Sequence, residues 1–173
     1  MKKTYIIILI LVSIAKLSFG QKLKPNSTIQ VNHVSFSTKS IDQSTMVVAN
    51  TQNNFINRKP KLPQSALTYF GKTDRSALLN AFTKVFNVSR LQELSSENGI
   101  LVNFYVSPQG KVLDVSFLLN TNTLLKANEI QQLDDAIKSN VTFKLRPEEV
   151  KGGDFFIITQ VVKYRKVLDG SLE

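Results

Sequence analysis

Residues 100–119, ILVNFYVSPQGKVLDVSFLL, carry the most regular pattern in this chain of 173 residues. Two runs rich in β-branched and aromatic residues flank a Ser-Pro-Gln-Gly turn. Apolar residues recur at every second position, at Val102, Phe104 and Val106 and again at Leu113, Val115 and Phe117. This period is typical of strands with one face on a core and one in water. Pro108 presets φ and Gly110 can adopt the left-handed conformation, so the segment predicts a β-hairpin.

The N-terminus, MKKTYIIILILVSIAKLSFGQ, has the order of a secretory signal peptide. Lys2 and Lys3 precede an apolar run of eleven residues, 5–15, and small residues follow before Gln21. We expect cleavage before Gln21, so that residues 1–20 are a signal peptide. The alternative is a retained anchor, but a spanning helix needs roughly 20 apolar residues. We therefore expect no stable membrane span after cleavage.

The net charge and the absence of cysteine limit which cellular compartments and which classes of partner we expect. The chain has 22 Lys and Arg and 13 Asp and Glu. Cleavage would remove three lysines with residues 1–20, so the mature chain would have a net charge of 19 − 13 = +6. There is no cysteine, so neither a disulfide nor a lipoprotein anchor is possible, and stability must come from the core. In the periplasm or outside the cell, the charge predicts at most weak binding to anionic surfaces and no nucleic-acid partner.

Residues 21–72 are polar and rich in Asn, Ser, Thr and Gln. Within them, 27–37 alternates well enough for one strand, and the prolines of 57–63 indicate an extended linker. We expect this polar, extended region to be loosely structured and to lie along the main domain.

Two helices are expected before the hairpin and one after it. Asp74 or Thr73 can cap the first, whose apolar face is Leu78, Ala81, Phe82 and Val85. Ser89 with Gln92 offers a capping box for a second short helix that ends at Gly99. The third has Ile130, Leu133 and Ile137 on one face, with Asn140 as its stop.

Two further strands, 141–145 and 155–166, follow the third helix. The order strand–strand–helix–strand predicts an α+β domain with a small antiparallel sheet of about three strands and helices on one face. This domain spans 73–168, with its central part at about 100–166, and 169–173 form a tail.

The C-terminal half resembles the TonB C-terminal-like domain family. The resemblance covers about residues 100–166 and rests on a tight turn followed by GKVLDVSF, a helix, and a Phe-Lys pair. The matching positions are Gly110, Lys111, Val112, Asp114, Val115, Ala136, Phe143 and Lys144. It implies the fold given above, a non-enzymatic role, and location in the envelope of a Gram-negative bacterium.

The chain departs from that family in three respects. Pro147 comes four residues after Phe143, where the family often has a proline two residues after the Phe. No Tyr-Pro pair leads into the first strand, and only three prolines lie between Gln21 and the helices. The long proline-rich arm of the energy-transducing members is missing, so the resemblance does not extend to energy transduction.

No residue pattern indicates catalysis or metal binding. His33 is the only histidine and lies far from the predicted core, and zinc spacing is impossible without cysteine. Asp134 and Asp135 are adjacent on a helix and diverge by about 100°. We expect no catalytic, cofactor-binding or metal site, and no cofactor.

The final strand is the candidate site. Its expected outward side chains are Ile157, Thr159, Val161 and Lys163. A partner peptide can add as a strand to such an edge, unless residues 27–37 already cover it. The function expected is an exported binding module, monomeric or weakly dimeric, that engages an envelope protein or peptide. The alternatives are a periplasmic immunity or inhibitor-type protein that uses loops, and a small hydrolase.

Overall fold

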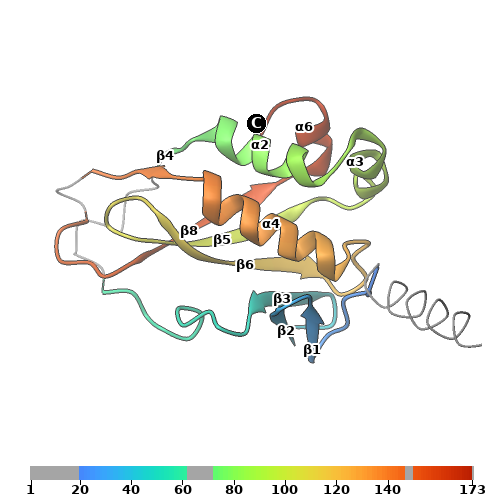
Figure 1. The fold of residues 1–173 in the computed structure, drawn as a ribbon, viewed down its shortest axis with the longest axis horizontal. Helices are drawn as coiled ribbons and strands as arrows, with labels where there is room; N and C mark the ends of the chain where they lie inside the picture. The colour runs from blue at the N-terminus through green and yellow to red at the C-terminus, as the bar shows by residue number, and fades with distance from the viewer. Residues whose placement is uncertain (1–19, 62–71, 147–149, 173) are drawn as a thin grey trace, which may run out of the picture.

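The computed structural model describes residues 20–61, 72–146 and 150–172, and the predicted signal peptide lies outside them. The chain is an α+β protein with a six-stranded antiparallel sheet in the order β1-β2-β3-β6-β5-β8 (Figure 1). Its strands are β1 (Ser27–Val31), β2 (Val34–Ser40), β3 (Thr45–Asn50), β5 (Ile100–Val106), β6 (Val112–Asn120) and β8 (Phe156–Val162). The helices are α2 (Arg75–Val85), α3 (Val88–Leu94), α4 (Ala127–Asn140) and α6 (Tyr164–Leu168).

The predicted hairpin is confirmed as β5 and β6, with Phe104 opposite Val115 and Val102 opposite Phe117. The alternation fails at one position. Val106 pairs with Val112, and the register shifts so that Leu113 is bypassed and remains half-buried. A bulge places two residues of one strand opposite one of the other. Val112, and not Leu113, therefore fills the buried position.

The prediction of a loosely structured region over 21–72 is wrong for residues 27–50. These residues form β1, β2 and β3, a meander in which β3 pairs with β6. The expected single strand at 27–37 is a hairpin, because Asn32 has a φ of 52° and turns the chain. The sheet therefore has six strands and not about three.

Side-chain caps define where two helices begin. Asp74 accepts a hydrogen bond from the Ala77 backbone N–H (3.1 Å), as expected. The second helix begins earlier than Ser89, because Asn87 accepts from the Arg90 backbone N–H (2.9 Å) and caps α3. It ends at Leu94, before Gly99. The third helix ends at Asn140, as the sequence predicts.

The last two predicted strands need correction. The segment 141–145 contributes only β7 (Phe143–Lys144), which pairs with β4 (Lys72–Thr73) in a separate two-stranded sheet. The strand expected over 155–166 ends at Val162, and the chain then turns into α6.

The helices lie on one face of the sheet, and their apolar stripes pack on its inward side chains (Figure 1). The most deeply buried side chains of this core, from both the sheet and the helices, include Phe36, Met46, Phe82, Phe104, Phe117, Leu133, Ile137 and Tyr164. Within residues 20–61, 72–146 and 150–172, no helix is long and apolar enough to cross a membrane. The other face carries no helix of the described residues, and the segment 51–61 covers part of it, with Phe55 against Tyr105 and Asn53 donating to the Val115 carbonyl.

Candidate partner-binding edge

β8 is an edge strand of the main sheet. It pairs with β5 along its whole length, from Val106 opposite Phe156 to Ile100 opposite Val162. No other strand of the described residues pairs with its second edge. The alternative that residues 27–37 cover this edge is wrong, because β1 lies at the opposite end of the sheet.

The side chains of β8 alternate between the core and solvent. Phe156, Ile158 and Val162 are buried, whereas Ile157 is 43% exposed and Val161 60% exposed. Thr159 is exposed between them. Three of the four residues predicted for the binding edge therefore lie side by side on the solvent face.

Lys163 is the exception among the four. It follows the strand and is the N-cap of α6, with extended backbone and no side-chain cap hydrogen bond. The strand ends there because the next residue, Tyr164, is fully buried and begins the helix. Lys163 therefore lies beyond the end of the edge and does not form part of the ladder.

β8 itself lacks three of the features by which soluble proteins protect edge strands. Charged residues, proline and bulges normally discourage pairing with another chain. The sequence of β8, FIITQVV, contains neither charge nor proline, and its pairing with β5 has no register shift. The opposite edge, β1, is shorter, presents Thr28 and Gln30 to solvent, and follows Pro25. β8 is the less protected of the two edges.

An aliphatic row continues from β8 across the solvent face of the sheet. Val161 lies opposite Leu101, Leu101 opposite Leu118, and Leu118 opposite Val47. The last three are only half-buried. Apolar side chains of an added strand would therefore extend an existing apolar row.

A small pocket borders the C-terminal half of the edge. It has a volume of about 230 Å³ and is lined by Arg75, Leu78, Gln160, Val161, Val162 and Leu172. Its walls come from α2, β8 and the segment after α6. Leu78 and Leu172 could not be predicted as neighbours of this edge, because no local sequence pattern shows that these segments meet.

The segment 51–61 fixes the N-terminal end of β8. Asp154 accepts hydrogen bonds from the Arg58 side chain (2.8 Å) and the Lys61 backbone N–H (3.1 Å). The guanidinium of Arg58 lies over the rings of Phe55 and Phe155, 5.6 and 5.2 Å from their centroids. The bond from Lys61 is the main cause that lowers the pKa of Asp154. These contacts hold the start of the strand in place.

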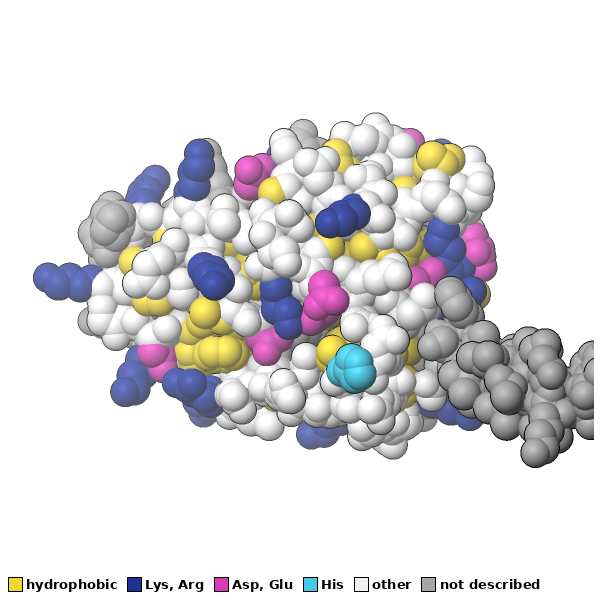
Figure 2. Space-filling view, viewed as in Figure 1, with side chains coloured by type: hydrophobic (Ala, Val, Ile, Leu, Met, Phe, Trp, Pro, Cys, Tyr) yellow, Lys and Arg dark blue, Asp and Glu magenta, His cyan; other side chains and the backbone are white. Residues whose placement is uncertain are grey.

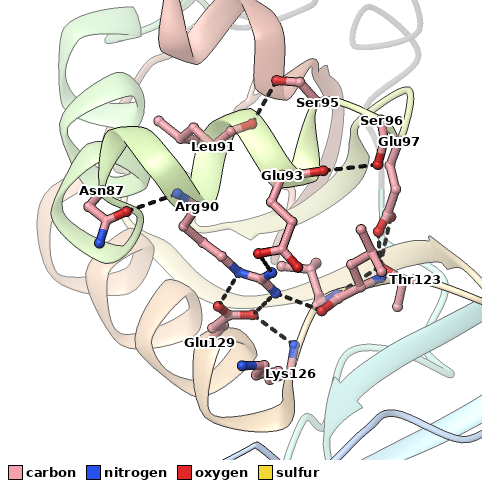
Figure 3. Close-up of polar contacts among 12 residues, drawn as sticks. Asn87, Arg90, Leu91, Glu93, Ser95, Ser96, Glu97, Thr123, Lys126 and Glu129 are labelled. Carbon is pink, nitrogen blue, oxygen red and sulfur yellow. Dashed lines mark hydrogen bonds and ion pairs between the residues drawn. The ribbon is translucent and has the colours of Figure 1, made fainter.

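A second polar cluster surrounds Arg90 (Figure 3). Its guanidinium donates to both carboxylate oxygens of Glu129 (2.7 and 2.9 Å) and to the Leu124 carbonyl (2.6 Å), and it pairs with Glu93. Glu129 also accepts from the Lys126 backbone N–H. These bonds raise the pKa of Arg90. The cluster joins α3 to the start of α4, and every one of these contacts is used to hold the fold.

A third cluster places a carboxylate in the interior. Asp134 is 2% exposed and pairs with Lys138 at 2.6 Å, and Lys138 also lies 3.8 Å from Asp114. Burial raises the pKa of Asp134 to about 6 despite the lysine.

His33, the single histidine, is exposed in the turn between β1 and β2 (Figure 2). Across the described part of the chain, no group of His, Asp and Glu side chains could hold a metal ion.

Lys and Arg are spread over the face seen in Figure 2 and do not gather into one patch. One pocket opens between α2 and α4, with a volume of about 370 Å³ and polar walls that include Lys84, Gln132, Asp135 and Asn140. The β8 edge is the surface feature that best fits a binding role.

Comparison with known proteins gives information on the fold alone. No family model matches the sequence, and no curated protein matches it. A crystal structure of a DUF5043 family protein from Bacteroides uniformis is similar, with a TM-score of 0.66 and 17% sequence identity. The similarity covers 84% of this chain and 89% of that chain. The overall α+β architecture is therefore shared with a solved structure.

Proposed function

We propose that this chain is an exported, non-enzymatic binding module of the bacterial envelope, and that it captures an extended segment of a partner protein at β8. The observation that carries the proposal is an edge strand without charge, proline or bulge and with two exposed aliphatic side chains, Ile157 and Val161. Main-chain hydrogen bonds to the edge would supply affinity, and alternate side chains would supply specificity.

The preferred peptide follows from the surface around the edge. Its side chains on the solvent face would lie beside Ile157, Thr159 and Val161, so small aliphatic or β-branched residues fit there. Its side chains on the other face would reach the pocket near Leu78 and Leu172. An extended segment with alternating apolar residues is the ligand that this edge would take.

The sequence resemblance gives independent support. Residues 100–166 resemble the TonB C-terminal-like domain family through a tight turn followed by GKVLDVSF, a helix, and a Phe-Lys pair. Together with the N-terminal sequence of a signal peptide, it favours the envelope of a Gram-negative bacterium as the location. Energy transduction is not part of the proposal.

A backbone test separates strand addition from binding by loops. A library of random twelve-residue peptides would be displayed, and binders would be selected against the protein comprising residues 21–173. The best binder would then be synthesised as a series in which each peptide carries one backbone N-methyl group. Strand addition predicts loss of binding at alternate positions, because only every second amide of an antiparallel strand faces its neighbour. A loss that follows no period of two, or no loss, would reject the proposal.

A protein variant locates the binding surface. Thr159→Lys places a charge on the solvent face of β8 and should weaken the selected peptide at least tenfold. Thr28→Lys makes the same change at the equivalent face of the opposite edge, β1, and should leave affinity unchanged. Circular dichroism of both variants checks that the fold is retained, since both side chains are exposed.

A further inference from the structure

The sequence of β8 is nearly symmetrical about its centre. Thr159 lies at the middle of FIITQVV, and the two exposed aliphatic residues, Ile157 and Val161, stand two positions on either side of it. An antiparallel pairing of two identical strands about Thr159 would therefore place each Ile157 opposite a Val161.

We infer that a second copy of this chain is a partner of the β8 edge, and that two copies pair antiparallel about a two-fold axis at Thr159. The axis is perpendicular to the sheet, so the helices of both copies lie on the same side. Such a contact is isologous, because the same patch is used by both subunits. The two six-stranded sheets become one continuous sheet.

Side chains on the solvent face fit this register. Two aliphatic pairs, each Ile157 with Val161, flank one pair of threonines at the axis. Opposed aliphatic and Thr–Thr pairs each contribute roughly 0.2–1 kcal/mol in antiparallel sheets. The aliphatic row that runs through Leu101 and Leu118 would continue across the axis into the second copy.

Neighbouring registers fit less well. Moving the axis to Ile158 places Ile157 opposite Thr159 and leaves Val161 beyond the strand of the second copy. Moving it to Gln160 leaves Ile157 level with Lys163, which lies beyond the end of the strand, so Ile157 loses its aliphatic partner. Pairing with one copy inverted would place the solvent face of one sheet on the helix side of the other. On the solvent face, the register centred on Thr159 pairs aliphatic with aliphatic and threonine with threonine; on the helix side it pairs Phe156 with Val162 and Ile158 with Gln160.

Charges at the ends of the strand favour the same register. Lys163, which is exposed, comes level with Phe155 of the second copy, and the next residue there is Asp154. Arg165, also exposed, follows on the same end. The two-fold axis repeats this arrangement, so each end of the interface brings basic residues toward Asp154, which already pairs with Arg58 of its own chain. Surface attractions of this kind contribute little energy but disfavour other registers.

Self-pairing and peptide capture would use one edge. The inference therefore rests on the same open strand as the proposed function, and the dimer would be the closed form of the site. A peptide could bind only to the monomer, so its apparent affinity should fall as protein concentration rises.

The absence of cysteine makes a crosslinking test simple. Thr159→Cys would place two thiols at the axis, where opposed Cβ atoms are about 4.5–5.5 Å apart and small shifts allow a disulfide. Mild oxidation should give a disulfide-linked dimer at low micromolar protein. Thr28→Cys, on the exposed face of β1, is the matched control and should stay monomeric. Equal crosslinking of the two variants would mean random collision and overturn the inference.

A charge exchange tests the register. Ile157→Lys alone should reduce the dimer fraction in native mass spectrometry and light scattering. Adding Val161→Glu in the same chain should restore it, because each introduced lysine then faces an introduced glutamate of the other copy. Within one strand these positions are about 13 Å apart and cannot pair.

The outcomes separate the two ideas. No dimer at any concentration, or no rescue by the second substitution, overturns self-pairing. The N-methyl series is measured on the monomer. Its result therefore tests peptide capture independently of whether the protein forms the dimer.

Discussion

Val48 of β3 lies directly opposite Phe117 of β6, and neither side chain is exposed to solvent. The pair joins the N-terminal meander to the hairpin on which the fold was expected to depend. Met46 and Leu119 make the next buried pair in the same register. Residues 27–50 are therefore part of the core and not a covering segment.

Deleting residues 21–50 should unfold the protein. The deletion removes Phe36, Met46 and Val48 from the core and exposes the edge of β6. Loss of several fully buried side chains, at roughly 2–5 kcal/mol each, exceeds the stability of most domains of this size. Circular dichroism should show a disordered or aggregated product. A stable, cooperatively melting fragment would contradict the fold as described.

Single core truncations should separate interior from periphery. Phe104→Ala, Phe117→Ala and Leu133→Ala remove side chains with 0% exposure, and each should lower the free energy of unfolding by roughly 2–5 kcal/mol. His33→Ala should change it by less than about 0.5 kcal/mol, because His33 is exposed. Urea denaturation measures both. Similar losses at His33 and Phe117 would overturn this division.

Gly110→Ala should be strongly destabilising. Gly110 has a φ of 83°, its carbonyl accepts from the Phe143 backbone N–H (2.8 Å), and a Cβ there would lie 1.9 Å from the Phe143 carbonyl oxygen. Gly152 has the same φ but nothing within 4 Å of its Cβ position. Gly152→Ala should therefore cost only the backbone strain, about 1–2 kcal/mol, and Gly110→Ala clearly more. Equal thermal melts of the two variants would contradict the close approach.

Asp134 should make stability depend on pH in a characteristic direction. Its pKa rises from 3.8 to about 6 on folding, so the folded state holds the proton more tightly than the unfolded chain. The contribution of Asp134 to the stability of the folded state is therefore most favourable below about pH 4 and is lost as the pH rises through 6. Asp134→Asn keeps a neutral side chain at every pH. At pH 7 the variant should be more stable than the wild type by roughly 1–3 kcal/mol, at about 1.4 kcal/mol per pKa unit.

The measurement is urea denaturation of both proteins at pH 4, 5, 6 and 7. Their difference in stability should grow between pH 4 and 7. Lys138 keeps Asp114 as a partner 3.8 Å away in the variant. A variant that is less stable at pH 7, with the pH dependence unchanged, would show that the Asp134–Lys138 ion pair outweighs the cost of burial.

The hairpin and the long helices could be predicted because their patterns are local. Residues 100–119 alternate with period two, and Ile130, Leu133 and Ile137 recur on one helical face, whatever lies next to them. The N-terminal strands were missed for two reasons. Asn26 and Asn32 adopt left-handed conformations that interrupt the pattern with turns, and the pairing of β3 with β6 joins residues about seventy positions apart. Strand preference depends on such neighbours.

At the candidate edge too, features with a local sequence pattern could be predicted, and features that depend on distant segments could not. Alternation along FIITQVV predicted which side chains face solvent, and the exposure of Ile157, Thr159 and Val161 confirms it. The end of the strand was misplaced, because the residues after Val162, KYRK, also fit a strand and only the burial of Tyr164 turns them into α6. The pocket near Leu78 and Leu172 depends on three distant segments and has no local signal.

Amide hydrogen exchange along β8 tests the central claim most directly. In the free monomer, the amides of β8 that face β5 should exchange slowly, and the alternate amides on the outer edge should exchange quickly. Addition of the selected peptide should slow the outer set, which alternates along β8, and leave the β1 amides unchanged. If the β8 amides keep their free rates while the loop at 120–128 becomes protected, the partner binds elsewhere and the edge-strand account is wrong.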